Sequence, residues 1–186
     1  MKSQNLDALS RIVDLDKIEA TKNSINEANG LPNECYLSDE YFKIEREKVF
    51  FNNWIVVGVS SSVPEVGDAK PFNLMGIPLL ILRDKNNKIK VFHNVCSHRG
   101  MILVKEECKL KNTIRCPYHS WSYNFNGELI ATPHVGGMNI HETEGFIKSK
   151  SNLKEISTHV WMDLIFINVN KNKKDFEGSI DPLENC

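Results

Sequence analysis

Two stretches of this sequence decide its fold: His93-Asn-Val-Cys96-Ser-His98-Arg99-Gly100 and Cys116-Pro-Tyr-His119-Ser-Trp121-Ser-Tyr123. Each stretch contains one cysteine and one histidine, separated by one residue in the first and by two in the second. Thiolates and neutral imidazoles are both metal ligands. Two such pairs on loops that face each other can supply four ligands to one metal centre. The candidate ligands are therefore Cys96, His98, Cys116 and His119.

Pairs that mix one Cys with one His are typical of a Rieske [2Fe–2S] cluster, in which two Cys bind one iron and two His bind the other. Exchanging Cys for His on one iron moves the reduction potential from about −400 mV to roughly −150 to +300 mV. Zinc is the main alternative, because a tetrahedral Cys₂His₂ site uses the same residue types. Zinc fingers usually pair Cys with Cys and His with His, so the mixed pairs favour the cluster. A chance pairing without metal is the third reading, since the chain has 5 Cys and 6 His.

The residues around both pairs resemble the large subunit of Rieske non-heme iron oxygenases. These are the ring-hydroxylating dioxygenases and their monooxygenase relatives, including those that act on quaternary ammonium compounds. The resemblance rests on the two stretches, continues through Asn124-Phe-Asn-Gly127-Glu-Leu129, and spans roughly residues 31–170. It implies that Cys96 and Cys116 bind the inner iron of one [2Fe–2S] cluster, and that His98 and His119 bind the outer iron.

The Rieske protein of quinol-oxidising respiratory complexes is a poorer match. That family carries a further Cys in each cluster loop, where this chain has Met101 and Tyr118. It also places a Ser, whose hydroxyl bonds a cluster sulfur, where this chain has Trp121. Fewer hydrogen bonds to sulfur lower the potential. We therefore expect a potential near the low end of the Rieske range.

The oxygenase resemblance also implies a mononuclear Fe(II) site in a further domain, held by two His and one carboxylate. His134, His141 and His159 do not fit that pattern. We interpret His134 and His141 as surface or loop-packing residues, and His159 is isolated in the sequence. The resemblance then implies that this chain is an oxidoreductase component that relays single electrons to an iron outside it. By the same resemblance, the isolated chain is not catalytically competent. The alternative function is a stand-alone Rieske-type ferredoxin that carries electrons.

The resemblance further implies three partners. A ferredoxin or flavin reductase would donate electrons, an oxygenase catalytic domain would accept them, and the family often forms homotrimers. Composition points away from other partners: the net charge is −1 and the pI about 6.6, which gives no preference for nucleic acid or anionic membranes.

The sequence predicts a cytoplasmic protein. Its longest apolar runs, such as Ile77–Leu82, span about six residues, against the ~20 that a transmembrane helix needs. The first residues lack the apolar region of a secretion signal. Cys35, Cys108 and Cys186 form no evident disulfide framework, as expected in a reducing compartment. We expect Cys108 to be a buried free thiol.

The overall pattern predicts a mainly β fold: an antiparallel Rieske-type iron–sulfur domain with a small cluster-binding subdomain and an N-terminal helix. Ser38 is the expected N-cap of a helix over 39–52. Asn126-Gly127 predicts a type I′ hairpin. Strands are expected over 54–60, 78–83, 88–93, 113–115, 120–125, 128–131 and 164–169.

The expected domain division follows from the same pattern. Residues 1–38 form an N-terminal extension, 39–170 the Rieske-type domain, and about 93–125 its cluster-binding subdomain. Residues 171–186 would begin a linker to a catalytic domain that this sequence does not contain.

Overall fold

The computed structural model describes residues 9–170 and 175–184. Two compact units, Met1–Asn52 and Asn53–Cys186, make up the chain and are described separately. Of the predicted linker over 171–186, residues 171–174 and 185–186 lie outside the described part. No helix among the described residues has the length and apolar character needed to cross a lipid bilayer.

The first unit is helical. It contains α2 (Leu15–Ala20), α3 (Glu34–Leu37), α4 (Asp39–Glu45) and a π-helical turn, η1 (Arg46–Phe50). The Ser38 Oγ accepts a hydrogen bond from the backbone N–H of Tyr41 at 3.2 Å, so the predicted N-cap is confirmed. The predicted helix changes from α to π winding at Arg46 and ends at Phe50 instead of 52.

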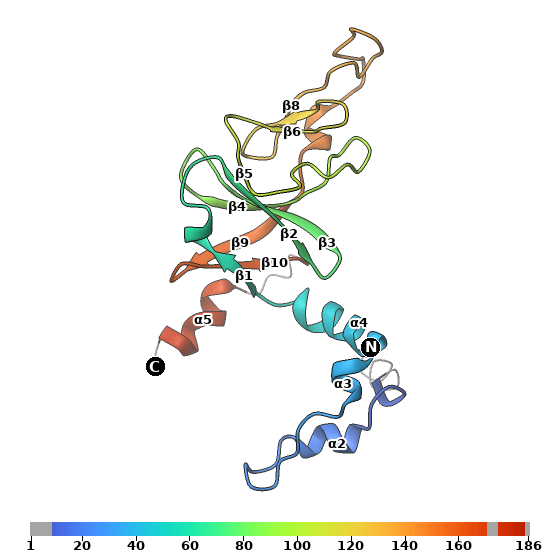
Figure 1. The fold of residues 1–186 in the computed structure, drawn as a ribbon, viewed down its shortest axis with the longest axis vertical. Helices are drawn as coiled ribbons and strands as arrows, with labels where there is room; N and C mark the ends of the chain where they lie inside the picture. Colours follow the sequence, from blue (N-terminus) through green and yellow to red (C-terminus); the bar gives the residue numbers. More distant parts are fainter. Residues whose placement is uncertain (1–8, 171–174, 185–186) are drawn as a thin grey trace. The chain divides into compact units, whose positions relative to one another are not determined.

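The second unit is built on a curled, antiparallel sheet of seven strands (Figure 1). Their order across the sheet is β1-β10-β9-β4-β3-β2-β5, so strands from the end of the unit lie between β1 and β4. The bounds are β1 (Ile55–Val59), β2 (Asp68–Leu74), β3 (Ile77–Arg83), β4 (Ile89–His93), β5 (Cys108–Lys109), β9 (Glu155–Trp161) and β10 (Leu164–Asn168). The predicted mainly β, antiparallel fold is confirmed.

A smaller sheet of three short strands, in the order β6-β7-β8, lies beside the large one (Figure 1). Its strands are β6 (Ile114–Arg115), β7 (Ser122–Tyr123) and β8 (Leu129–Ala131). The remaining elements are the 3₁₀ turns η2 (Ser60–Ser62) and η3 (Lys148–Ser151) and the helix α5 (Phe176–Glu184). Phe176 anchors α5, because its ring stacks on His159 with centroids 3.9 Å apart.

Strand β3 divides the interior into two hydrophobic cores. Leu79 and Ile81 point into one core, together with residues of β9 and β10. Leu80 and Leu82 point into the other, which also contains the small sheet and the two candidate cysteines. Successive side chains of a strand point to opposite faces, so an unbroken apolar strand serves both cores. The candidate site is thereby fixed to the rigid centre of the unit.

The predicted hairpin at Asn126-Gly127 is present, but the predicted type I′ turn is wrong. Type I′ needs positive φ at both central residues, and here only Gly127 has it, at +79°. The backbone N–H of Gly127 donates to Asn124 O at 3.0 Å, which makes a type I turn followed by a left-handed glycine. A Cβ at Gly127 would also lie 2.6 Å from the Phe92 ring.

Positive φ at both central residues occurs instead in two turns that the sequence reading did not predict. They are Met75-Gly76, between β2 and β3, and Met162-Asp163, between β9 and β10. Strands β2, β5 and β9 were not predicted either. The expected strands are all present, with ends shifted by a few residues, as is usual for boundaries taken from sequence.

Candidate metal centre

The first candidate loop begins where β4 ends and is closed by a buried asparagine. The Asn94 side chain, 2% exposed, donates through Nδ2 to Val104 O at 2.6 Å. Its Oδ1 accepts from the backbone N–H of Val104 at 3.0 Å. Because one side chain satisfies both the backbone N–H and the backbone C=O of a residue ten positions away, the loop is held as a narrow hairpin. An antiparallel bridge between Val95 and Ile102 continues that hairpin.

Cys96 stands at the base of the turn that follows. Its N–H donates to Met101 O at 2.8 Å, and the N–H of Gly100 donates back to Cys96 O at 3.0 Å. Gly100 has a φ of +70°, a conformation that glycine adopts without steric cost. The turn therefore places His98 at the tip of the loop and Cys96 at its base.

The second loop repeats this turn. The N–H of Cys116 donates to Trp121 O at 2.8 Å, and the N–H of Ser120 donates to Cys116 O at 3.1 Å. Ser120 has a φ of +59° and occupies the position that Gly100 occupies in the first loop. The sequence therefore builds the same backbone turn twice, once after each candidate cysteine.

The two turns bring the predicted ligands together, cysteines inside and histidines outside. Cys96 and Cys116 are each 2% exposed, whereas His98 is exposed and His119 half-buried. The rings of His98 and His119 lie edge to face with their centroids 4.9 Å apart. The two histidines therefore lie nearer to solvent than the two cysteines.

His119 provides a direct test of fit to a metal. Its Nδ1 is buried and has no hydrogen-bond partner. A buried polar nitrogen without a partner is costly in a folded protein and calls for an explanation. Coordination of an iron by Nδ1 would explain this missing hydrogen bond.

Among the described residues, no three or more His, Cys, Asp or Glu side chains are placed to hold a single ion. A two-iron cluster needs only two protein ligands on each iron, so two pairs suffice.

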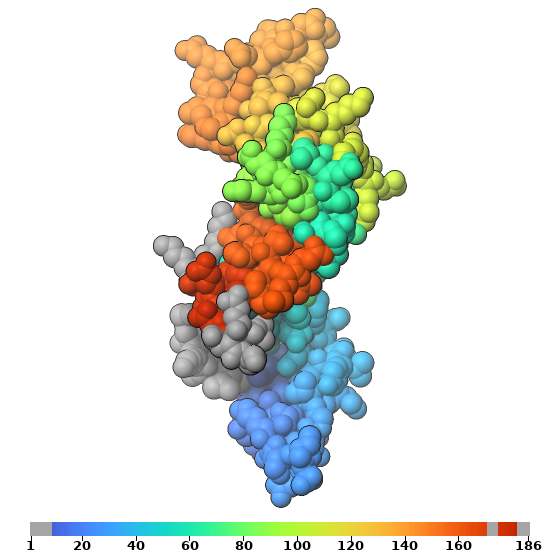
Figure 2. All heavy atoms as spheres, turned by 90° about the vertical axis from the view of Figure 1, so that its left-hand side faces the viewer, coloured from blue at the N-terminus to red at the C-terminus, as the bar shows by residue number. Residues whose placement is uncertain are grey.

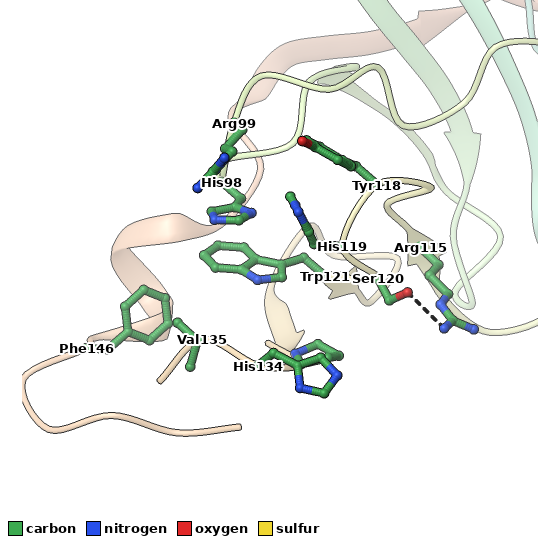
Figure 3. A pocket seen from close by; sticks show the side chains of 11 residues that line it. His98, Arg99, Arg115, Tyr118, His119, Ser120, Trp121, His134, Val135 and Phe146 are labelled. Carbon is green, nitrogen blue, oxygen red and sulfur yellow. Dashed lines mark hydrogen bonds between the residues drawn. The ribbon is translucent and has the colours of Figure 1, made fainter. Parts of the chain in front are cut away.

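Aromatic side chains flank both histidines (Figure 3). The Trp121 ring, 4% exposed, stacks on His98 with centroids 4.6 Å apart and an interplanar angle of 12°. Trp121 therefore shields one flank of His98. Tyr118 lies against His119 with ring centroids 3.7 Å apart and is largely exposed. Each imidazole is therefore held between protein rings.

Tyr123 is a site residue that sequence reasoning missed. Its hydroxyl lies 3.3 Å from Cys96 Sγ, and it accepts a hydrogen bond from the backbone N–H of Ser97 at 3.1 Å. Burial and then the hydrogen bond with Cys96 raise the pKa of Tyr123 to about 12, so the hydroxyl keeps its proton. A buried tyrosine normally has a hydrogen-bond partner for its hydroxyl, but the sequence does not indicate which residue that partner is.

The electrostatics around the first pair favour neutral groups. Burial raises the pKa of the Cys96 thiol. Burial, followed by the nearby charges of His119 and Arg99, lowers the pKa of His98. A neutral imidazole is the form that binds metal, whereas a thiol must lose its proton to do so. Metal binding here is therefore expected to release protons from the cysteines.

The other histidines are not part of this group. The N–H of Asn139 donates to His134 Nδ1 at 2.8 Å, and the N–H of His134 donates to His141 Nδ1 at 3.2 Å. Both rings therefore hold the loop after β8, which confirms the loop-packing interpretation. His159 packs on α5 through Phe176.

The prediction for Cys108 is wrong, because its side chain is exposed and not buried. It lies on β5, a strand of two residues at the edge of the large sheet that pairs with β2 on one side only. Such a short edge strand leaves its side chains open to solvent.

A cavity of about 700 Å³ opens beside the two candidate histidines (Figure 3). Arg99 and Arg115 line it, and so does His134 from the loop after β8. No Asp or Glu is among its lining residues. In Figure 2 the same end of the unit shows that loop, in orange, beside the yellow segment of the second candidate loop. The surface next to the histidines is therefore hollow and positively charged.

Comparison with known proteins agrees with this geometry. The sequence model of the Rieske [2Fe-2S] domain matches residues 53–144, which include all four candidate ligands. This chain carries a Rieske domain.

Its relatives place that domain among Rieske oxygenase alpha subunits. The oxygenase subunit of carnitine monooxygenase from Acinetobacter baumannii is 32% identical over 149 residues, which are 80% of this chain and 39% of the relative. Biphenyl dioxygenase subunit alpha from Metapseudomonas furukawaii is 29% identical, over 86% of this chain and 36% of the relative.

Solved structures show the same fold for the Rieske domain. The apo form of a quaternary ammonium Rieske monooxygenase superposes with a TM-score of 0.74 at 28% identity. That superposition covers 84% of this chain and 44% of the other. The chain thus spans about two fifths of the length of the relatives that it matches.

Proposed function

We propose that this Rieske domain holds one [2Fe–2S] cluster and relays single electrons to a mononuclear Fe(II) site in an oxygenase catalytic domain outside this sequence. Cys96 and Cys116 would bind one iron, and His98 and His119 the other. The repeated turn that buries each cysteine and directs a histidine outward is the observation that carries the proposal. When bound, the cluster supplies reversible one-electron transfer.

The protein's own contribution is to hold the ligands and to control access to them. The two thiols lie in the core that contains Leu80 and Leu82, where water is excluded. The two imidazoles lie at the wall of the positively charged cavity, where a partner can approach them. Preorganised ligands on rigid loops need little rearrangement when the charge changes. These features suit an electron relay whose exchange takes place at the histidine side.

The partners follow from the family as part of the same proposal. A ferredoxin or flavin reductase would donate electrons, and the catalytic domain would accept them. One solved relative is described as showing inter-subunit electron transfer in a quaternary ammonium Rieske monooxygenase. We extend this to a homotrimer of the whole protein, located in the cytoplasm.

We also propose the domain division expected from the sequence. An N-terminal extension would cover residues 1–38, and the Rieske domain 39–170 with its cluster-binding subdomain at about 93–125. A linker would begin at 171. Limited proteolysis of the cluster-loaded protein checks this division by the fragment that resists cleavage.

The first experiment is chemical analysis of the chain expressed with iron and sulfide available. We expect about two iron and two acid-labile sulfide per chain, visible absorbance, and an electron paramagnetic resonance signal that appears on one-electron reduction. One zinc per chain, without colour, would support the alternative Cys₂His₂ site and refute the cluster.

A second experiment separates the oxygenase relay from a stand-alone electron carrier. It measures the mass of the native polypeptide in its source cells. A polypeptide much longer than these 186 residues, with a further iron, supports the relay to a catalytic domain. A native polypeptide of this length that exchanges electrons with a separate protein supports the carrier. Substrate hydroxylation by the purified 186-residue chain would refute the view that it is not competent alone.

A further inference from the structure

Ser120 stands in a backbone conformation that its side chain disfavours. Its φ of +59° lies in the left-handed region, where a Cβ crowds the following carbonyl oxygen. The matching position of the first loop is Gly100, with a φ of +70° and no Cβ. The two turns share the same backbone hydrogen bonds. They differ in that the second turn has a serine side chain at this position.

The Ser120 hydroxyl accepts a hydrogen bond from the Arg115 guanidinium. Arg115 Nη2 lies 2.9 Å from Ser120 Oγ. The dashed line in Figure 3 marks this hydrogen bond. Arg115 is the residue before Cys116, and Ser120 is the residue after His119. Arg115 is thus held at both ends by the second candidate loop: its backbone is bonded to Cys116, and its guanidinium donates to Ser120. Both residues line the cavity beside His119.

We propose that Ser120 positions the Arg115 charge next to the second ligand loop, and that this charge raises the midpoint potential of the cluster. The inference rests on the proposed function, because it requires a cluster bound at Cys116 and His119. One-electron reduction adds a negative charge to the cluster, and a nearby positive charge stabilises the reduced form. The guanidinium supplies that positive charge. Ser120 is a positioning residue that acts through Arg115.

The experiment compares midpoint potentials and melting temperatures of the cluster-loaded chain at low ionic strength. In Arg115→Gln we expect a lower midpoint, with the equilibrium constant for one-electron reduction falling about two- to fivefold, the order expected for one solvent-screened charge. Because the guanidinium is exposed, the shift should shrink in high salt.

Two Ser120 variants separate positioning from stability. Both Ser120→Gly and Ser120→Ala remove the hydroxyl, so both should lower the midpoint. Their stabilities should differ, because Gly relieves the left-handed strain and Ala keeps it. Ser120→Gly should melt higher than Ser120→Ala. In the double variant Arg115→Gln with Ser120→Gly, the midpoint should fall no further than in Arg115→Gln alone.

A matched control changes the same net charge elsewhere. Lys148 pairs with Glu142 at 3.3 Å and does not line the cavity, so Lys148→Gln should leave the midpoint unchanged. An unchanged midpoint in Arg115→Gln, or an equal shift in Lys148→Gln, would overturn the proposal. So would Ser120 variants whose midpoints stay at the wild-type value. A wild-type chain that binds no cluster would instead contradict the proposed function.

Discussion

The Tyr123 hydroxyl lies 3.3 Å from Cys96 Sγ and accepts a hydrogen bond from the N–H of Ser97 at 3.1 Å. Because the hydroxyl oxygen accepts from that N–H, its own O–H is free to donate a hydrogen bond to the Cys96 sulfur. A hydrogen bond to a ligand thiolate withdraws electron density and raises the reduction potential. We therefore expect Tyr123→Phe to assemble the cluster and to show a lower midpoint in a redox titration.

The result is specific only if other tyrosines behave differently. Tyr36, an exposed residue of the first unit, provides the control, and Tyr36→Phe should leave the midpoint unchanged. A Tyr123→Phe protein with the wild-type midpoint would show that the contact does not donate to a ligand sulfur. The wild-type midpoint itself tests the expectation, made from Trp121, of a value near the low end of the Rieske range.

The second prediction tests whether a proposed ligand cysteine behaves differently from a cysteine outside the candidate site. Cys116 is 2% exposed beside His119, whereas Cys108 is exposed on the edge strand β5. Cys116→Ser should lose the visible absorbance and at least half of the iron, because it removes one thiolate ligand. Cys108→Ser should keep both at wild-type levels. Equal iron and sulfide contents in the two variants would contradict the ligand assignment.

Local spacing explains why the four candidate ligands could be predicted from the sequence to lie close together. Each Cys and His pair lies within one turn, so the loop that joins them fixes their distance. The hairpin at Asp84–Asn87 was predictable for the same reason, since Asp84 Oδ1 accepts from Asn86 N at 2.9 Å and from Lys88 N at 2.8 Å. Structural features that depend only on residues close together in the sequence can be predicted from the sequence.

Features that depend on distant contacts were not predictable. Strand β2 contains Pro71, which argues against a central strand. It is accommodated because β5 pairs only with Asp68 and Ala69, so the position of Pro71 has no partner strand on that side. The contact of Tyr123 with Cys96 joins residues 27 apart, and nothing in the local pattern indicates it. The exposure of Cys108 likewise follows from the position of β5 at the sheet edge.

Asn94 supports a third prediction, on stability. Its amide satisfies both the N–H and the C=O of Val104 in the core. Asn94→Ala should lower the free energy of unfolding by about 1–3 kcal/mol, because it leaves buried polar groups unpaired. Asn94→Asp should be worse near neutral pH, since it replaces the donor to Val104 O with a buried carboxylate oxygen. Urea unfolding measures both, and an Asp variant as stable as wild type would contradict the observed hydrogen bonds.

The turn between β9 and β10 gives a fourth prediction, on pH. Asp163 accepts hydrogen bonds from Ser60 Oγ at 2.6 Å and from Ser61 Oγ at 2.7 Å, which tie this turn to η2. The hydrogen bonds from Ser60 and then Ser61 lower the pKa of Asp163 below its ordinary value of 3.8. The stabilisation is therefore fully present above that ordinary value. It is lost as the pH falls through the lower pKa of the folded protein.

Asp163→Asn removes this dependence on pH, because an amide does not titrate in this range. The variant should be less stable than wild type near neutral pH, and the difference should narrow as the pH falls below about 3.8. Urea unfolding of both proteins at a series of pH values measures the difference directly. A stability difference that stays constant into strong acid would show that the Ser60 and Ser61 contacts do not depend on the charge of Asp163. A difference that widens in acid would reverse the sign of the linkage and would place the pKa of the folded state above that of the unfolded state.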